Sequence, residues 1–240
     1  MNILLTGGSR GLGLAIAQQQ LELGNFVFIV NRSISPELNE LLVRHSEHAA
    51  FIECDLAQPE KLKESIFDQH FSNSIPIHGF VNNAAIAYDD LISNLDLGPL
   101  ETMFRVNVFS PMALTKYVVR NMLLHRTAGS IVHVSSICSR KGYKGLAMYA
   151  ATKGAIEAFS KNLAREWGSM GIRSNCVVPG FMETSMSASL TETQREKLNS
   201  RTSLKSATSI LSVVATVEFL LSEVSCSVTG QEFVVDSGTI

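Results

Sequence analysis

The sequence predicts an α/β fold with a doubly wound parallel sheet. Short runs rich in β-branched and aromatic residues alternate with longer stretches of helical pattern, and this alternation is typical of βαβ units. Most of the short runs are apolar throughout, as in strands that are buried on both faces of a sheet. We therefore expect residues 1–240 to form a single domain, with a central parallel sheet of about seven strands and helices on both faces.

The predicted elements follow one another along the chain. The strands are expected at residues 3–5, 26–30, 50–54, 79–81, 131–134, 172–178 and 233–235. The helices are expected at residues 11–23, 59–70, 100–124, 149–167 and 209–222. Residues 181–206 break this rhythm, because they are rich in Ser, Thr, Met and charge. Long insertions in compact domains are often functional, so we expect a helical substrate lid there, with a plain surface excursion as the alternative.

Composition excludes several classes of protein. The 240 residues carry 20 basic and 22 acidic side chains, a net charge of −2 and no run of like charge, so no nucleic-acid or membrane-surface partner is predicted. The apolar stretches are too short to cross a bilayer, and the N-terminus has no basic region of a signal peptide. The four cysteines form no CxxC pair, which indicates buried free thiols and a cytoplasmic location. His45 and His48 have no third ligand nearby in the sequence, so no metal site is predicted.

A glycine-rich turn follows the first predicted strand. It reads TGGSRGLG from Thr6 to Gly13 and runs into a helix. Glycines let the backbone turn tightly and approach a ligand closely, and the free N–H groups at a helix start attract an anion such as pyrophosphate. The succession of strand, turn and helix predicts a dinucleotide site of the Rossmann type. A tight turn without a ligand is the alternative.

The end of the second strand indicates which dinucleotide binds. An acid at this position would accept hydrogen bonds from ribose hydroxyls and would repel a 2′-phosphate, but the chain reads Asn31-Arg32 there. The guanidinium of Arg32 can pair with a phosphate, and Arg10 in the glycine turn supports the same interpretation. We therefore predict NADP(H) over NAD(H), with Arg32 as a solvated turn residue as the alternative.

Polar residues also end the third and fourth strands. Asp55 could accept a hydrogen bond from the adenine amino group, or it could cap the helix that follows. The stretch Asn82 to Ala85 combines two amides with small side chains, which would let a flat cofactor lie against the backbone. Asparagine pairs suit plain turns as well.

Tyr149 and Lys153 are candidates for acid–base chemistry. They lie four residues apart in a predicted helix, so both side chains project from one face. A neighbouring ammonium favours the phenolate and lowers the pKa of a tyrosine from its usual ~10 towards neutral pH. Ser136 stands at the end of the fifth strand, where doubly wound folds bind their ligands, and could donate to a substrate carbonyl. Taken alone, the tyrosine–lysine pair also fits an ordinary helix surface.

These motifs, in this order and spacing, resemble those of the short-chain dehydrogenase/reductase family. They are TGGSRGLG, NNAA, VSS and YAATK, together with Asn107 in RVNV, VPGFMET at 178–184 and the C-terminal TGQ and DSG. Within the family the chain looks most like the 3-oxoacyl-[acyl-carrier-protein] reductases, on the stretches NNAAIAYDDL, SKNLARE and PGFMET. The resemblance implies an NADP(H)-dependent oxidoreductase of fatty acid biosynthesis that reduces the 3-oxo group of an acyl thioester to a hydroxyl.

The resemblance also implies a role for each motif residue. Tyr149 would protonate the substrate oxygen as hydride arrives, Lys153 would hold the nicotinamide ribose, and Ser136 would orient the carbonyl. Asn107 would hold a water that passes protons to Lys153. The residues that would bind the cofactor are Thr6, Gly7, Ser9, Arg10, Gly11, Leu12, Gly13, Asn31, Arg32, Asp55, Leu56, Asn83, Ala84, Ala85, Tyr149, Lys153, Pro179, Gly180, Met182 and Thr184.

The chain departs from the family pattern at three positions. The family usually reads NNAG where this chain has Ala85, and its carrier-protein reductases often carry arginines where this chain has Ser130 and Met170. Basic residues that could substitute are Arg126, Arg140, Lys141 and Arg173. An acyl carrier protein is one expected partner, and a free ketone or alcohol, such as a sugar or polyketide, is the alternative substrate. A nucleotide-sensing regulator without catalysis is a third possibility, but it predicts a damaged tyrosine–lysine pair.

A homotetramer is predicted, with a dimer as the fallback. The helix at 149–167 is apolar on more than one face and carries small residues that let another helix approach. The helix at 100–124 is similarly apolar, and the C-terminus ends in apolar residues. The family resemblance implies tetramers with two-fold axes through such elements.

Overall fold

Seven parallel strands form the centre of the molecule, in the order β3-β2-β1-β4-β5-β6-β7. The computed structural model describes residues 1–71, 74–184 and 191–240. The strands are β1 (Asn2–Thr6), β2 (Phe26–Asn31), β3 (Ala49–Glu53), β4 (Gly79–Asn82), β5 (Ser130–Val134), β6 (Arg173–Pro179) and β7 (Glu232–Val235). The predicted seven-stranded, doubly wound sheet is confirmed.

The strand order reverses beside β1. This strand pairs with β2 on one side and with β4 on the other, so the chain winds outward from β1 in both directions. Such a reversal leaves a crevice beyond the carboxyl ends of the two strands, where open α/β sheets bind their ligands.

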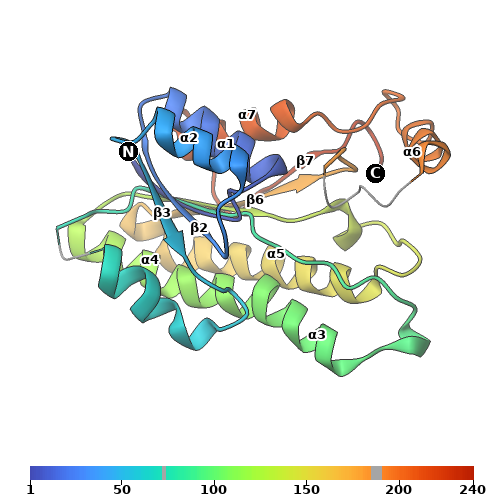
Figure 1. The fold of residues 1–240 in the computed structure, drawn as a ribbon, viewed down its shortest axis with the longest axis horizontal. Coiled ribbons are helices and arrows are strands. Elements are labelled where there is room, and N and C mark those ends of the chain that lie inside the picture. Colours follow the sequence, from blue (N-terminus) through green and yellow to red (C-terminus); the bar gives the residue numbers. More distant parts are fainter. Residues whose placement is uncertain (72–73, 185–190) are drawn as a thin grey trace.

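Helices cover both faces of the sheet (Figure 1). The helices α1 (Gly11–Glu22), α2 (Pro36–Arg44) and α7 (Ile210–Leu221) lie on one face, and α3 (Leu97–Phe104), α4 (Ser110–His125) and α5 (Ala147–Trp167) lie on the other. Each layer has its own apolar core. Along β1, Ile3 and Leu5 pack towards α1 and α7, whereas Leu4 packs towards α4, because successive side chains of a strand point to opposite faces. This explains why the strands are apolar without alternation.

Two predicted helices have a different local geometry. Residues 59–70 form a 3₁₀ turn at Pro59–Lys61 and a π-helical segment at Lys63–Asp68. The predicted helix at 100–124 is a longer rod in which a π-helical segment, Arg105–Phe109, joins α3 to α4. The structure also adds α2, whose start is fixed by Ser35, because its hydroxyl accepts a hydrogen bond from the backbone N–H of Leu38.

Part of the predicted lid falls on residues 185–190, which lie outside the described residues. After them, α6 (Glu192–Asn199) begins with a capping box between Thr191 and Gln194. In the described parts of the chain, no helix combines the length and apolarity needed to cross a membrane. The four cysteines are free, but Cys226 is exposed and not buried as predicted, because it follows a short surface turn after α7.

Candidate active site

The predicted site motifs lie at one edge of the sheet. Because all seven strands are parallel, the segments that follow β1, β4, β5 and β6 meet at their carboxyl ends. The glycine turn, the asparagine loop, the serine turn and the proline–glycine segment are therefore neighbours around the crevice. Tyr149 and Lys153 reach this edge from α5, which packs along β6.

Asn83 links the glycine turn to the loop after β4 by hydrogen bonds. Its side-chain amide donates to the carbonyls of Thr6 and Gly7, both at 3.0 Å. In return, the hydroxyl of Thr6 accepts from the backbone N–H groups of Asn83 and Ala84, both at 3.1 Å. Thr6 and Asn83, both predicted to bind the cofactor, therefore use their side chains to hold these two loops together. In all, four hydrogen bonds join the turn before α1 to the loop after β4.

The glycine turn has the backbone geometry of an anion cradle. Gly7 has a φ of +74°, and a Cβ on Gly13 would lie 2.0 Å from the carbonyl oxygen of Gly7, so only glycine fits. The side chain of Arg10, the residue before α1, makes no capping hydrogen bond, and the first turn of α1 has no acidic residue. The N–H groups at this helix start are therefore available to an anion such as a pyrophosphate.

Arg10 and Arg32 lie on two loops that are held side by side. The hydroxyl of Ser35 donates to the carbonyl of Ser9 at 2.6 Å and links the loop after β2 to the glycine turn. Asn31 donates to the carbonyl of Ser33 and closes the turn that carries Arg32. Both arginines are exposed. Within the described residues, neither guanidinium has a hydrogen-bond or ion-pair partner, so both are available to a phosphate group.

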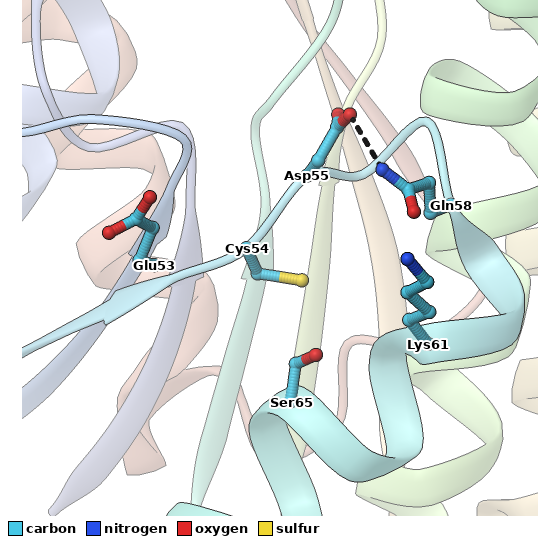
Figure 2. Close-up of a pocket in the computed structure, with 6 residues that line it drawn as sticks. All are labelled: Glu53, Cys54, Asp55, Gln58, Lys61 and Ser65. Atoms are coloured by element: carbon cyan, nitrogen blue, oxygen red, sulfur yellow. Dashed lines mark hydrogen bonds between the residues drawn. The ribbon is translucent and has the colours of Figure 1, made fainter.

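A hollow of about 290 Å³ lies beside the end of β3, and Figure 2 shows the residues around it. It is lined by Glu53, Cys54, Asp55, Gln58, Lys61 and Ser65. The carboxylate of Asp55 accepts from the backbone of Ala57 at 3.0 Å and from the amide of Gln58 at 3.3 Å. Asp55 therefore caps the turn that follows. This is the second of the two roles that the sequence allowed for Asp55, the first being a contact with adenine. The next residue, Leu56, is buried, and its carbonyl accepts from Ser110 at 2.5 Å.

Lys153 is buried beside Tyr149. Its ammonium lies 5.6 Å from the centre of the Tyr149 ring and donates to the carbonyl of Val134, the last residue of β5, at 2.9 Å. The residue is only 5% exposed. Burial disfavours the charged form and lowers the pKa of Lys153 to about 8, although Glu157 and nearby thiols oppose this shift. The lysine can therefore change its charge near neutral pH.

The environment of Tyr149 differs from the prediction. We expected Lys153 to lower the tyrosine pKa, but burial raises it, with further contributions from Cys138 and Asp89. The physical reason is that the Lys153 ammonium faces the carbonyl of Val134 while the phenol is removed from water. Tyr149 is therefore a neutral phenol with a proton to donate.

The two serines after β5 have different surroundings. Ser135 is buried and donates to Glu157 at 2.6 Å. Ser136 is half-buried and begins the short turn Ile137–Ser139, where its hydroxyl accepts from the backbone of Cys138 at 3.3 Å. Of the pair, Ser136 is the more exposed serine. Its role as the substrate-orienting residue stays a prediction.

Asn107 joins three segments of the site. Its amide donates to the carbonyl of Ile86 at 2.8 Å and to the hydroxyl of Thr152 at 3.1 Å, and its oxygen accepts from the backbone of Ile86 at 2.9 Å. The residue lies in the π-helical segment, whose extra residue per turn changes the direction of the side chain. Asn107 thus contacts the neighbour of Lys153. A water between Asn107 and Lys153 stays a prediction.

The segment after β6 faces the glycine turn. The backbone of Gly180 donates to Val235 at 2.9 Å, and a Cβ on Gly180 would lie 2.7 Å from Cα of Asp236. Further along, Thr184 lies 3.7 Å from the Cβ position of Gly11. Met182 packs against the core beneath α1 and α7. Pro179, at the end of β6, is buried.

Four polar residues around the site were missed by sequence reasoning, namely Ser135, Thr152, Glu157 and His133. Glu157 lies four residues after Lys153 on the same helix face, and this spacing was the one signal available. His133 is fully buried in β5, and burial lowers its pKa to about 3. Its ring lies edge-on to Phe80 and Phe159.

Comparison with known proteins identifies relatives over nearly the full length. Residues 7–239 match the family described as enoyl-(acyl carrier protein) reductase. The chain is 34% identical to a 3-oxoacyl-[acyl-carrier-protein] reductase, FabG, of Chlamydia pneumoniae, over 98% of this chain and 95% of that protein. It is 33% identical to the 3-oxoacyl-[acyl-carrier-protein] reductase of Mus musculus, over 97% and 94%.

A solved structure shares the fold and the arrangement of its elements. The gluconate 5-dehydrogenase of Burkholderia cenocepacia, crystallised in complex with NADP and tartrate, superimposes with a TM-score of 0.90 and 27% identity. The match covers 99% of this chain and 94% of that chain.

Proposed function

Because the chain belongs to the short-chain dehydrogenase/reductase family of oxidoreductases, we propose that it is an NADP(H)-dependent reductase of the 3-oxo group of acyl thioesters. The observation that carries this proposal is the pairing of the half-buried Tyr149 with the buried Lys153 at the carboxyl end of β5, next to the Ser136 turn. The identity to 3-oxoacyl-[acyl-carrier-protein] reductases supports the substrate class. A cytoplasmic location is part of the same proposal.

Cofactor binding is supported by the fit of the residues at the crevice. The glycine turn and the uncapped start of α1 would hold the pyrophosphate, and the free guanidinium groups of Arg10 and Arg32 would hold the 2′-phosphate. NADPH would supply the hydride that reduces the carbonyl carbon. The NADP complex of the Burkholderia relative agrees with this choice of cofactor.

The side chains on α5 and after β5 account for the proton chemistry. The hydroxyl of Ser136 would donate a hydrogen bond to the substrate carbonyl and hold it beside Tyr149. As the carbonyl carbon gains hydride, the phenol of Tyr149 would give its proton to the oxygen, and the product is a hydroxyl group. The raised pKa of Tyr149 keeps that proton in place at neutral pH. The ammonium of Lys153 would stabilise the phenolate that is left behind.

The surroundings of the basic residues favour a second candidate substrate. Ser130 is buried and donates to the carbonyl of Leu220 at 2.7 Å. Arg173 donates to the carbonyls of Ser222 and Val228, and Arg140 pairs with Glu232. Lys141 likewise donates to the carbonyl of Thr239. Of the basic residues named above, the exposed Arg126 is therefore the one that the described part of the chain leaves open to an acidic carrier protein. A small-molecule ketone, as in the gluconate 5-dehydrogenase relative, is the second candidate.

A substrate screen tests the proposal. Loss of NADPH absorbance would be followed with acetoacetyl thioesters of coenzyme A and of acyl carrier protein, and with a panel of sugar-acid ketones. We expect the thioesters to give the highest kcat/KM. Turnover of the sugar-acid ketones without turnover of the thioesters would establish the second candidate. No turnover with any ketone, by a folded protein that binds NADPH, would contradict the proposed reductase.

A further inference from the structure

Glu157 is a buried carboxylate beside the active site. It lies on α5, one turn after Lys153, and only 8% of the residue is exposed. A buried charge is costly unless hydrogen bonds or opposite charges compensate it. The proton and hydride chemistry derived above does not use this residue. Its position therefore needs another explanation.

The carboxylate of Glu157 accepts hydrogen bonds from the segment around Ser136. One oxygen, Oε1, accepts from the hydroxyl of Ser135 at 2.6 Å. The hydroxyl of Ser139 lies 2.7 Å both from this oxygen and from the carbonyl of Ser136, and shares its single proton between them. Ser135 and Ser139 stand on either side of Ser136, within the same turn. Ser139 also contacts the carbonyl of Ser136 through its backbone N–H at 3.1 Å. Glu157 on α5 therefore contacts residues on both sides of Ser136 and can fix the position of Ser136 relative to α5.

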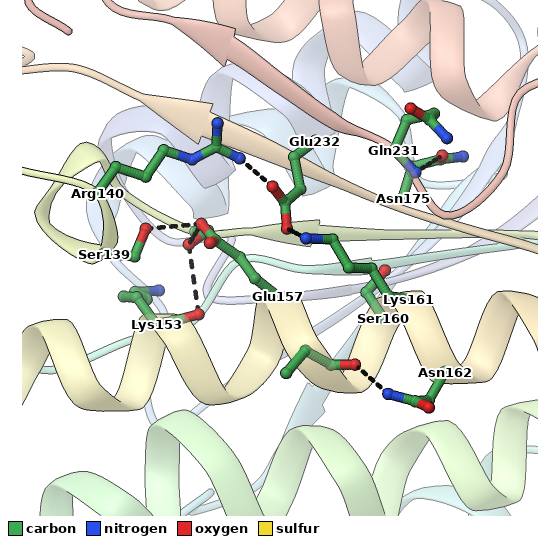
Figure 3. A network of polar contacts seen from close by, with 12 residues as sticks. Ser139, Arg140, Lys153, Glu157, Ser160, Lys161, Asn162, Asn175, Gln231 and Glu232 are labelled. Carbon is green, nitrogen blue, oxygen red and sulfur yellow. Dashed lines mark hydrogen bonds and ion pairs between the residues drawn. The ribbon is translucent and has the colours of Figure 1, made fainter.

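A second carboxylate holds the next residue of the turn. Arg140 pairs with Glu232 on β7, and Glu232 also pairs with Lys161 on α5 at 2.7 Å. Figure 3 shows this chain of contacts, with Ser139 next to Glu157 and Arg140 next to Glu232. The Glu232 contacts lie nearer the surface, because the side chain of Lys161 is 56% exposed. Glu157, in contrast, lies on α5 one turn after Lys153 and is 8% exposed.

Glu157 also balances the charge of Lys153. Both residues are buried on one face of α5, and the carboxylate favours the protonated form of the lysine against the effect of burial. The titratable or charged groups around this pair, from the elements packed against it, are Asp89, His133, Cys138, Arg140, Tyr149, Lys161, Cys176 and Glu232. The buried histidine is neutral and the buried thiol is protonated at neutral pH. Of the carboxylates named here, Glu157 is the one that lies on α5 itself, one turn from Lys153.

We propose that Glu157 is a positioning residue of this enzyme, which fixes the Ser136 turn through Ser135 and Ser139 and supplies the negative charge that keeps Lys153 an ammonium. The inference rests on the proposed function, because Ser136 and Lys153 are taken as parts of the reductase site. Glu157 itself touches neither substrate nor cofactor in this arrangement.

Kinetics of two Glu157 variants test the proposal. We expect Glu157→Ala to lower kcat about ten- to hundred-fold, since it removes two hydrogen bonds to a charged group, with little change in the KM for NADPH. Glu157→Gln still accepts from both serines but has no charge, so kcat should recover at neutral pH. As the pH is raised, the activity of this variant should be lost at a lower pH than that of the wild type. The reason is that the Lys153 ammonium has lost its counter-charge and gives up its proton earlier. Glu166→Gln, an exposed glutamate on the same helix, is the matched control and should behave as wild type.

Two outcomes would overturn the proposal. In the first, both Glu157 variants keep the wild-type kcat and pH profile. In the second, Glu157→Ala melts early and loses activity only in proportion to its folded fraction, while Glu157→Gln keeps the wild-type pH profile. That pattern would assign Glu157 a purely structural role.

A binding-independent measurement separates this proposal from the proposed function. NMR of ¹⁵N-lysine-labelled protein, with Lys153→Met for assignment, follows the titration of the Lys153 amine without substrate. If no ketone is turned over but Glu157→Gln lowers the Lys153 pKa and Glu166→Gln does not, the reductase function fails and the charge role of Glu157 stands. If ketones are turned over and the Lys153 titration is the same in all three proteins, the Glu157 proposal fails alone.

Discussion

Tyr149 is the residue on which the proposed chemistry depends most directly, because only its hydroxyl would deliver the proton. We predict that Tyr149→Phe reduces kcat by roughly 100-fold or more. NADPH affinity, measured by the change in nicotinamide fluorescence, should be nearly unchanged, because the ring is kept. A variant that turns over at the wild-type rate would show that another group is the acid.

Arg32 determines the predicted preference for the phosphorylated cofactor. Its guanidinium is exposed and free within the described residues, so Arg32→Asp should weaken NADPH binding about ten- to hundred-fold and favour NADH. Titration of both cofactors with the variant measures the ratio. Arg44→Asp, an exposed arginine at the far end of α2, is the control. An unchanged ratio in Arg32→Asp would mean that Arg10 recognises the phosphate.

His133 predicts how stability depends on pH. Its pKa is about 3 in the folded protein because of burial, and about 6.5 in an unfolded chain. Below pH ~6.5 the His133 imidazole binds a proton in the unfolded chain but not in the folded protein. The free energy of unfolding therefore falls as the pH falls towards 3. Urea unfolding between pH 7 and pH 4 would measure this slope. His133→Gln should reduce the slope, and an equal slope in both proteins would contradict the prediction.

Sequence reasoning selected the proposed reacting residues, but it did not reveal their surroundings. Tyr149, Lys153 and Ser136 stand out because they occur together with the other motifs, in the order and spacing of one family. Glu157 resembles any solvated glutamate on a helix, since burial and the approach of two serine hydroxyls arise only in the fold. The direction of the Tyr149 pKa shift was wrong for a similar reason, because desolvation cannot be read from neighbours in sequence.

At the scale of elements, the strands were predicted well and the helix geometry less well. Buried parallel strands are short apolar runs, and their ends agree with the observed ones to within about two residues, as is normal for such boundaries. The π-helical segment at Arg105–Phe109 follows no visible periodicity, because one extra residue in a turn does not change the composition of the stretch. The orientation of Asn107 therefore had to come from the structure.

The glycine turn allows a prediction for its element. Gly13→Ala would place a methyl group 2.0 Å from the backbone oxygen of Gly7, and backbone cannot move aside as a flexible side chain can. We expect a loss of about 3 kcal/mol or more in the free energy of unfolding, together with loss of NADPH binding. Gly98→Ala, whose new methyl would meet Asp96 at an ordinary 3.5 Å, is the control. Equal urea midpoints for the two variants would contradict this account.

The whole molecule presents apolar surfaces that one subunit leaves uncovered. Val234 on the edge strand β7 is 38% exposed and Leu211 on α7 is 75% exposed, while Ala151 and Ala158 form a small-residue face on α5. We therefore predict a homotetramer, with a mass in light scattering near four times 26.2 kDa. Val234→Lys should lower that mass, whereas Val43→Lys on α2 should not. A wild-type mass of 26.2 kDa would exclude the tetramer and the dimer.

The position of β1 between β2 and β4 has a consequence for the order in which the molecule assembles. The hydrogen bonds between Thr6 and Asn83 close a loop of 77 residues, and the entropy lost in closing so long a loop must come before any contact compensates it. Pairings of this kind fold slowly. During synthesis, the glycine turn can therefore form its hydrogen bonds to Asn83 only after β4 and the loop that follows it have been made. The residues of the glycine turn and of the asparagine loop are all synthesised before Tyr149 and Lys153, so the growing chain holds the parts of its anion site before those of its proton chemistry.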